Sequence, residues 1–168
     1  TLLSPDDIRQ GVAFSSKKRL FESIAAFVVE KLHCENGEQA CFECLFEREK
    51  LGNSGLGNGV AMPKAKLPTT VSDKILTVFM QLETPVEYDA ADNKPVDIVF
   101  AVLVPENHCQ EYIPVLAELN EKLTDKNLIK QLRSAQNADE IWQIFECADH
   151  SEESEDDTNL DNIEPQEV

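Results

Sequence analysis

The feature that most limits the fold is a run of ten almost entirely apolar residues, VDIVFAVLVP, from Val96 to Pro105. A strand that is half exposed alternates apolar with polar residues, whereas a strand buried on both faces does not. A second apolar run, KILTVFMQLE from Lys74 to Glu83, also reads as a strand, because it is rich in β-branched and large apolar residues. The sequence therefore predicts a sheet that needs cover on both faces.

Segments with a helical period supply that cover. Apolar residues recur at spacings of three and four in SSKKRLFESIAAFVVEKLH and again after Pro105, and EQACFECLFEREKL forms a helix that Gly52 ends. Strands that alternate with helices are typical of α/β domains. We expect an α/β fold: a single-domain layered sandwich, with a mixed central β-sheet flanked by helices on both faces. The apolar positions of the two periodic helices are Leu20, Ile24, Phe27, Val28, Leu32, Ile113, Leu116, Leu119 and Leu123.

Capping residues predict the shorter helices. SPDDIRQ reads as a helix start with Ser4 as its cap, and GVAF as a short strand. Near the end of the domain, Thr124 is the expected cap of TDKNLIKQLRSA and Asn137 that of NADEIWQIFECA.

Charge divides the chain into two parts. The chain has 168 residues, which suits one domain, and its net charge of −17 argues against nucleic acid or an anionic membrane surface as a partner. Residues 151–168 hold eight acidic residues and no basic one, and they lack apolar periodicity. We expect a domain over residues 1–149 and an acidic, disordered tail over residues 150–168, which solvates the chain end or binds a basic surface.

The sequence shows no sign of export. Its first residues lack a basic segment followed by an apolar one, and no apolar run approaches the roughly 20 residues that span a bilayer. A soluble, cytoplasmic protein is expected, and its five cysteines are expected to be free thiols.

The stretch GNSGLGNGVAMPKAKL, from Gly52 to Leu67, invites a phosphate-binding interpretation. It is not a P-loop, because no Gly-Lys-Ser/Thr follows at the required spacing. A dinucleotide-binding loop should follow a strand and open a helix, and this stretch follows a helix. Spacing alone leaves two alternatives, a phosphate site and a tight connection that needs positive φ angles.

Two other groups of residues are candidate sites. The side chains of His33, Cys34, Cys41 and Cys44 offer soft metal ligands, but Cys41 and Cys44 lie within a helical pattern and no second ligand pair follows. Buried cysteines that act as small hydrophobic residues are the commoner case. His108 stands alone near the start of a predicted helix. We expect no metal and no other cofactor.

The run FEREKLGNSGLGNGVAMPKAKL, followed by VFMQLETPVEYDAADNKPVDIVFAVLVP, resembles the enzyme IIA domain of bacterial phosphotransferase systems. The branch is the nitrogen-regulatory IIA proteins, which are close to the fructose and mannitol IIA domains. The motif is a helix ending in Arg-Glu-Lys, then Gly-x-Ser/Thr-Gly-x-Gly-Asn-Gly, a short strand and an Ala-x-Pro triplet. The resemblance covers most of residues 1–147.

In this family the residue after that proline is a histidine, which accepts a phosphoryl group from a small phosphocarrier protein. A second histidine supports it from the helix after the Leu-Val-Pro strand end. The resemblance puts Lys64 at the first position and Tyr112 at the second. It implies that Arg48 and Ser54 are further site residues, and that the glycine stretch contributes a binding surface of Gly55, Gly57, Asn58 and Gly59.

The two replaced histidines change the expected activity. Phosphoryl transfer needs a nucleophile with a free lone pair at neutral pH, which histidine supplies and protonated lysine does not. We therefore expect a regulatory protein of the nitrogen branch that is not phosphorylated at the usual site and acts by protein–protein binding. Whether it is an enzyme stays open, since an active phosphoryl carrier that uses His108 is the alternative. His108 would share a helix face with Tyr112 if the helix starts early enough.

The resemblance also implies partners. They are regulatory targets such as a potassium transport regulator or a sensor kinase, and an HPr-like phosphocarrier that binds without productive transfer.

Overall fold

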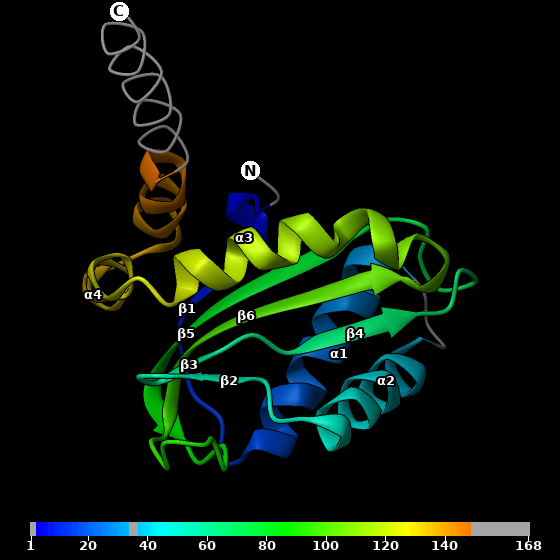
Figure 1. Cartoon of the computed structure of the whole chain (residues 1–168), viewed down its shortest axis with the longest axis horizontal. Coiled ribbons are helices and arrows are strands. Elements are labelled where there is room, and N and C mark those ends of the chain that lie inside the picture. The colour runs from blue at the N-terminus through cyan, green and yellow to red at the C-terminus, as the bar shows by residue number, and fades with distance from the viewer. Residues whose placement is uncertain (1–2, 34–36, 149–168) are drawn as a thin grey trace, which may run out of the picture.

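A mixed six-stranded sheet forms the centre of the molecule (Figure 1). The computed structural model describes residues 3–33 and 37–148, so the predicted acidic tail lies outside the described residues. The long strands β5 and β6 are antiparallel neighbours, and β1, β3 and β4 run parallel to the strand that each joins. The sheet order is β1 (Ile8–Val12), β5 (Leu76–Val86), β6 (Val96–Pro105), β3 (Val60–Ala61) and β2 (Gly55–Gly57), with β4 (Lys64–Leu67) pairing further along β6.

Helices cover both faces of this sheet. Figure 1 shows α1 (Lys17–Leu32) and α2 (Glu38–Leu51) on one side of the strands and α3 (Ile113–Leu123) on the other. The second face also packs against α4 (Lys126–Ser134) and a helix over residues 138–148. The predicted α/β sandwich is confirmed.

Each face has its own apolar core. Under α1 and α2, the fully buried Phe21 and Tyr88 pack edge to face, with ring centroids 6.2 Å apart. On the other face, Phe79, Phe100 and Phe145 form a triad of edge-to-face pairs at 5.5 to 6.1 Å. Each such buried side chain contributes about 1.5–3 kcal/mol by removing apolar surface from water.

The strand β6 has the bounds that its apolar run predicted, and all but one of its residues are buried. Two smaller expectations were wrong. In SPDDIRQ, helical structure stops after the 3₁₀ turn η1 (Pro5–Asp7), because Ile8 already pairs with β5. The cap of α4 is Asp125, whose carboxylate accepts hydrogen bonds from the first turn of the helix; Thr124 instead closes α3.

A 3₁₀ segment, η2 (Glu106–Tyr112), joins β6 to α3 and also contacts β4. Pro105 comes directly before η2, and Pro114 lies in the first turn of α3, where a missing N–H costs nothing. The chain therefore turns back across the end of the sheet before the α-helix begins.

In residues 3–33 and 37–148, no helix is both long and apolar enough to cross a bilayer.

Candidate functional site

The glycine-rich stretch forms a hairpin. Strands β2 and β3 pair antiparallel, and the turn residues Gly57, Asn58 and Gly59 have φ angles of 92°, 56° and 81°. Left-handed backbone at three consecutive positions favours glycine and asparagine. Of the two alternatives left open by spacing, the turn has the conformation of a tight connection.

Several polar groups of this turn are bound within the protein. Asn58 N donates to Asp92 Oδ2 at 3.0 Å, and Arg133 on α4 donates to Asn58 O. The Arg133 guanidinium also pairs with Asp97, at 2.9 to 3.1 Å from its carboxylate oxygens. A phosphate cradle would use backbone N–H groups such as that of Asn58. These contacts give the turn a structural role.

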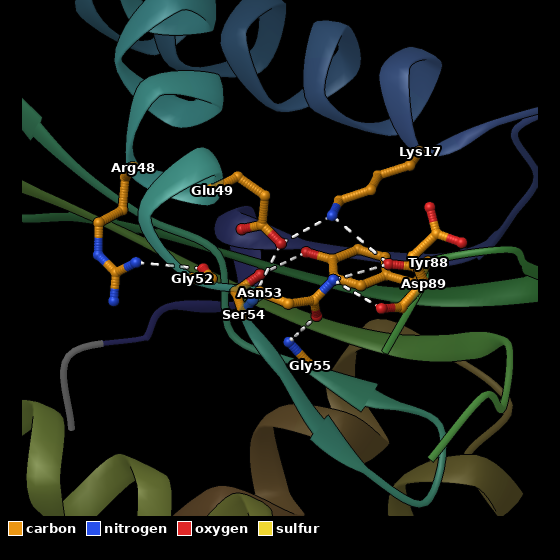
Figure 2. A network of polar contacts seen from close by, with 9 residues as sticks. All are labelled: Lys17, Arg48, Glu49, Gly52, Asn53, Ser54, Gly55, Tyr88 and Asp89. Atoms are coloured by element: carbon orange, nitrogen blue, oxygen red, sulfur yellow. Dashed lines mark hydrogen bonds and ion pairs between the residues drawn. The ribbon is translucent and has the colours of Figure 1, made fainter. Parts of the chain in front are cut away.

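Ser54 belongs to a buried polar network that joins the glycine stretch to α1 and α2 (Figure 2). Its Oγ lies 2.6 Å from the hydroxyl of Tyr88, and its N donates to Glu49 Oε1 at 2.9 Å. The same carboxylate oxygen is 2.7 Å from Lys17 Nζ, which sits 4.1 Å from the centroid of the Tyr88 ring. Burial, with the charge of Glu49 adding to it, raises the pKa of Tyr88, so its hydroxyl stays protonated.

Asn53 extends this network to the next loop. Its Nδ2 donates to Tyr88 O at 2.9 Å and Asp89 O at 3.1 Å, while its Oδ1 accepts from Gly55 N at 2.8 Å. There is no room for a side chain at Gly55, because a Cβ would lie 2.8 Å from Asn53 Oδ1 and 2.9 Å from Ala90 Cβ. The start of the glycine stretch is therefore held in one position by α1, α2 and the β5–β6 connection.

Arg48 points away from this network, as Figure 2 shows. Its Nη1 donates to Gly52 O at 3.2 Å, and its side chain makes no other hydrogen bond or ion pair within the described residues. A guanidinium has five N–H donors, so most of those on Arg48 are available to a further group.

Lys64 is the first residue of β4, a strand that pairs only with β6. Ala65 and Leu67 are buried in the core under α1 and α2. Because successive side chains point to opposite faces of a sheet, Lys64 and Lys66 lie on the other face. Val102, the register partner of Lys64, belongs to the core of that second face, which agrees with this assignment.

Lys64 is half-buried, on a strand that contacts the helix of Arg48. Burial first, and the positive charge of Arg48 second, lower the pKa of Lys64, while Glu49 acts in the opposite direction. That carboxylate is itself paired with Lys17. Within the described residues, Lys64 makes no hydrogen bond or ion pair. Within the described residues, neither Lys64 nor Arg48 forms an ion pair, in a chain of net charge −17.

Tyr112 and His108 both lie in η2. Tyr112 is half-buried and packs against the core of the same face that Lys64 occupies. His108 Nδ1 lies 3.1 Å from Glu111 Oε1, and its side chain is 41% exposed. The α-helix starts only at Ile113, and His108 has the non-helical angles φ −123° and ψ 16°. The early helix start that would put His108 and Tyr112 on one helix face is therefore wrong.

The predicted site residues fall into two groups in space. Lys64 begins β4, and this strand contacts both α2, which carries Arg48, and η2, which carries Tyr112 and His108. The turn of Gly57, Asn58 and Gly59 is instead held by Arg133 on α4. Ser54 lies in the buried polar network, with its hydroxyl bound to Tyr88.

The cysteines and His33 have structural surroundings. Cys41 is fully buried in the core, and burial raises its pKa to about 12; burial also raises that of Cys44. His33 ends α1 in a left-handed conformation. Cys34 lies outside the described residues, and within them no cluster of three His, Cys, Asp or Glu side chains is placed to hold a metal ion.

Sequence reasoning missed the residues that hold this region in place. They come from segments far apart in the chain, and each is an ordinary residue of a helix or loop when read alone. The sequence offered one signal, Glu49 of the Arg-Glu-Lys motif. It stands close in sequence to Ser54, and a charged side chain that becomes buried there needs a partner such as Lys17. The missed residues are Lys17, Glu49, Asn53, Tyr88, Asp92, Asp97 and Arg133.

The fold and the motif both agree with known proteins. The sequence model of the family described as "Phosphoenolpyruvate-dependent sugar phosphotransferase system, EIIA 2" matches residues 1–147. A "Nitrogen regulatory protein homolog" of Haemophilus influenzae is 74% identical over 151 residues, which are 90% of this chain and 92% of the relative.

Solved structures give the same result. The crystal structure of nitrogen regulatory protein IIA-Ntr from Neisseria meningitidis has a TM-score of 0.77 at 36% identity, covering 85% of this chain and 95% of that one. Enzyme IIAMtl from Escherichia coli, solved in complex with phosphorylated enzyme IIBMtl, shares the fold with a TM-score of 0.66 at 22% identity, covering 84% and 95%. The chain therefore belongs to the EIIA 2 family of the phosphoenolpyruvate-dependent sugar phosphotransferase system, in the branch of the nitrogen regulatory IIA proteins.

Proposed function

We propose that this chain is a nitrogen-regulatory IIA protein that does not accept a phosphoryl group at the usual site and acts by binding other proteins. The observation that carries the proposal is Lys64, which directly follows Ala61-Met62-Pro63 at the position of the family's acceptor histidine. The surrounding motif is kept, so the proposal concerns the acceptor and leaves the scaffold unchanged.

The chemistry of the two side chains supports this proposal. Histidine has a pKa of about 6.5 and offers a ring lone pair at neutral pH, whereas the pKa of lysine is about 10. Burial and Arg48 lower the pKa of Lys64, but no partner within the described residues holds its amine in place for an attack. The neighbouring Arg48 favours an anion at this position without supplying a base to remove the lysine proton.

The second replaced position supports it further. Tyr112 stands where the family has its supporting histidine, and its ring packs against the core. A tyrosine hydroxyl is a weak acid and does not replace the imidazole as a charged or proton-sharing partner near neutral pH.

Binding to other proteins fits the exposed apolar side chains on α2 and at the start of α3. Among the described residues, the large hydrophobic side chains that are exposed are Leu51, at 85%, and Ile113, at 60%. Leu51 lies three positions after Arg48 on α2, and Ile113 directly follows Tyr112. Exposed apolar side chains are frequent in protein-binding surfaces. The family-like partners are a potassium transport regulator or a sensor kinase, and a phosphocarrier that binds without productive transfer.

The proposal is tested by incubating the purified chain with phosphoenolpyruvate, the first enzyme of the system and its phosphocarrier, and then measuring its intact mass. We expect an unchanged mass. A stable gain of one phosphoryl group per chain would overturn the proposal.

A second candidate function, that of an active phosphoryl carrier, rests on His108. Glu111 Oε1 lies 3.1 Å from His108 Nδ1 and is placed to hold a proton on that nitrogen, which leaves the lone pair on Nε2. The same incubation decides between the two functions. Labelling that is abolished in His108→Ala but kept in the control His33→Ala would establish this candidate.

A further inference from the structure

The helix α4 has an exposed basic face, formed by Lys126, Lys130 and Arg133. Residues three and four positions apart lie on the same side of a helix, so these three side chains are neighbours. Within the described residues, the side chains of Lys126 and Lys130 make no hydrogen bond or ion pair. The carboxylate of Asp125 caps the helix by accepting from Asn127 N and Leu128 N. The two lysines are therefore available to an anionic group.

This basic face belongs to a strongly acidic chain. The net charge is −17, and α2, α3 and the helix over residues 138–148 each have more acidic than basic residues. Among the described helices, only α4 has basic residues and no acidic one. Like charges on one helix face repel each other, and an anionic group above them would remove that repulsion.

The acidic residues that follow the described part of the chain start close to α4. Ala148, the last described residue, lines the same cavity as Leu128 and Gln131 of α4. Figure 1 shows the helix that ends there, in orange, next to α4. Five acidic residues come four to nine positions after Ala148: Glu152, Glu153, Glu155, Asp156 and Asp157.

The length of this connection is sufficient for a contact. An extended chain of four to nine residues spans about 13 to 32 Å. The basic face from Lys126 to Arg133 is about 10 Å long, because a helix rises 1.5 Å per residue. Residues 152–157 can therefore lie along the whole face without any movement of the described helices.

We propose that the acidic residues 152–157 bind the basic face of α4 in the same chain. A single exposed ion pair contributes little, so the contact depends on several pairs together. The covalent connection favours this segment over other acidic groups, since it gives the segment an effective concentration in the millimolar range. Another acidic protein surface would reach α4 only by displacing residues 152–157. The inference is independent of the proposed function, because Lys64 and Tyr112 are not part of this face.

The test measures the backbone amide signals of residues 152–157 by NMR in the full chain. Lys126→Met together with Lys130→Met should move these signals, because the segment loses two of its three basic contacts. The matched control is Lys18→Met together with Lys74→Met, which removes the same charge at exposed positions on α1 and before β5. The control should leave the signals in place. Unmoved signals in the first variant, or equal movement in both, would overturn the inference.

Ionic strength provides a second measurement on the same proteins. An increase from about 0.01 M to about 1 M shortens the Debye length from about 30 Å to about 3 Å. The signal differences between the unchanged chain and the variant of Lys126 and Lys130 should then fall to less than about a third. Differences that salt does not reduce would mean that the charges do not hold the segment, which contradicts the proposal.

Crosslinking identifies which group covers the basic face. Unlabelled and isotope-labelled full chains are mixed in equal amounts and treated with a carbodiimide, which joins a carboxylate directly to a lysine amine. Mass spectrometry should find residues 152–157 joined to Lys126 or Lys130, with the same label in both peptides. Peptides of mixed label would show that a second copy supplies the acidic segment. That result, the absence of crosslinks, or equal crosslinking to Lys18 would each refute the contact within one chain.

Discussion

The hydroxyl groups of Ser54 and Tyr88 lie 2.6 Å apart in the interior, 34 positions apart in the sequence. This contact ties the start of the glycine stretch to the connection between β5 and β6. Tyr88 is fully buried, so its hydroxyl has lost water and depends on Ser54 for a partner.

This pair predicts strong coupling between two substitutions. Tyr88→Phe leaves the hydroxyl of Ser54 buried with its partner removed, and Ser54→Ala does the same to Tyr88. Each single change should lower the free energy of unfolding by about 1–3 kcal/mol. The double variant should lose clearly less than the sum, which urea denaturation of all four proteins measures. Additive losses would mean that the two hydroxyls do not depend on each other.

We expect a larger loss of stability when Lys17, a member of the same network, is replaced. The side chain of its partner Glu49 is only 7% exposed, so Lys17→Met leaves a buried carboxylate with Ser54 N as its remaining partner. We expect a loss of about 2–4 kcal/mol, near the lower end for a broken buried ion pair because Lys17 is 19% exposed. Lys18→Met is the matched control, since Lys18 is the exposed neighbour, and denaturation of both variants should differ by that amount. Equal stability of the two would show that the ion pair contributes nothing.

Much of the fold could be predicted because long elements carry their own periodic signal. The strand β6 and the helix α2 begin and end where the sequence indicates, since an unbroken apolar run and the breaker Gly52 are local features. The strand β4 was missed, because in Lys64-Ala65-Lys66-Leu67 only two short apolar residues mark the buried face. A strand of four residues at the sheet edge is set by its partner β6 more than by its own sequence.

The site could be predicted only where the motif is continuous. Lys64 and Arg48 are 16 positions apart, and their placement together follows from the resemblance. The pairing of Lys17 with Glu49, and of Arg133 with Asp97, joins segments that share no local pattern. Such contacts exist only once the layers have packed, so a single sequence gives no signal for them.

In the turn of the glycine stretch, we expect the substitution Gly59→Ala to lower the stability of the fold. A Cβ there would overlap with Arg133 Nη2 and lie 2.9 Å from Asp97 Oδ1, and φ is 81°. Gly59→Ala should therefore both strain the backbone and disturb the ion pair. Gly11→Ala is the control, because Gly11 has a φ of 71° and nothing within 4 Å of its Cβ position.

The control should cost about 1–2 kcal/mol, the price of the left-handed backbone alone. Thermal or urea unfolding should show a further loss of about 1–2 kcal/mol for Gly59→Ala, comparable with the loss of a hydrogen-bonded charged contact. If the two variants are equally stable, the contacts of Arg133 with this turn do not constrain Gly59.

The lowered pKa of Lys64 predicts a measurable titration. Methyl groups added to the lysines with isotope-labelled formaldehyde report each amine by NMR, and Lys64 should titrate below its ordinary value of 10.5, because burial and Arg48 disfavour its charge. Arg48→Met should move that titration upward. An unchanged titration in Arg48→Met would contradict the proximity of the two cations.

The lowered pKa of Lys64 also determines how the stability of the folded chain changes with pH. With its pKa lowered on folding, Lys64 binds more protons in the unfolded chain between its folded pKa and 10.5. The free energy of unfolding is therefore reduced at pH values below that window, and it increases as the pH rises through it. Lys64→Met should remove this dependence, so the difference in stability between variant and parent should shrink with rising pH over that window. A constant difference would contradict the shift.

The central claim is that Lys64 occupies the position of the acceptor and prevents transfer on an otherwise intact scaffold. The most direct test is intact mass spectrometry of the unchanged chain and of the double variant Lys64→His, Tyr112→His, after incubation with phosphoenolpyruvate, the first enzyme and the phosphocarrier. We expect no added phosphate on the unchanged chain and one phosphoryl group on the double variant. Phosphate on the unchanged chain, or none on a folded double variant, would contradict it.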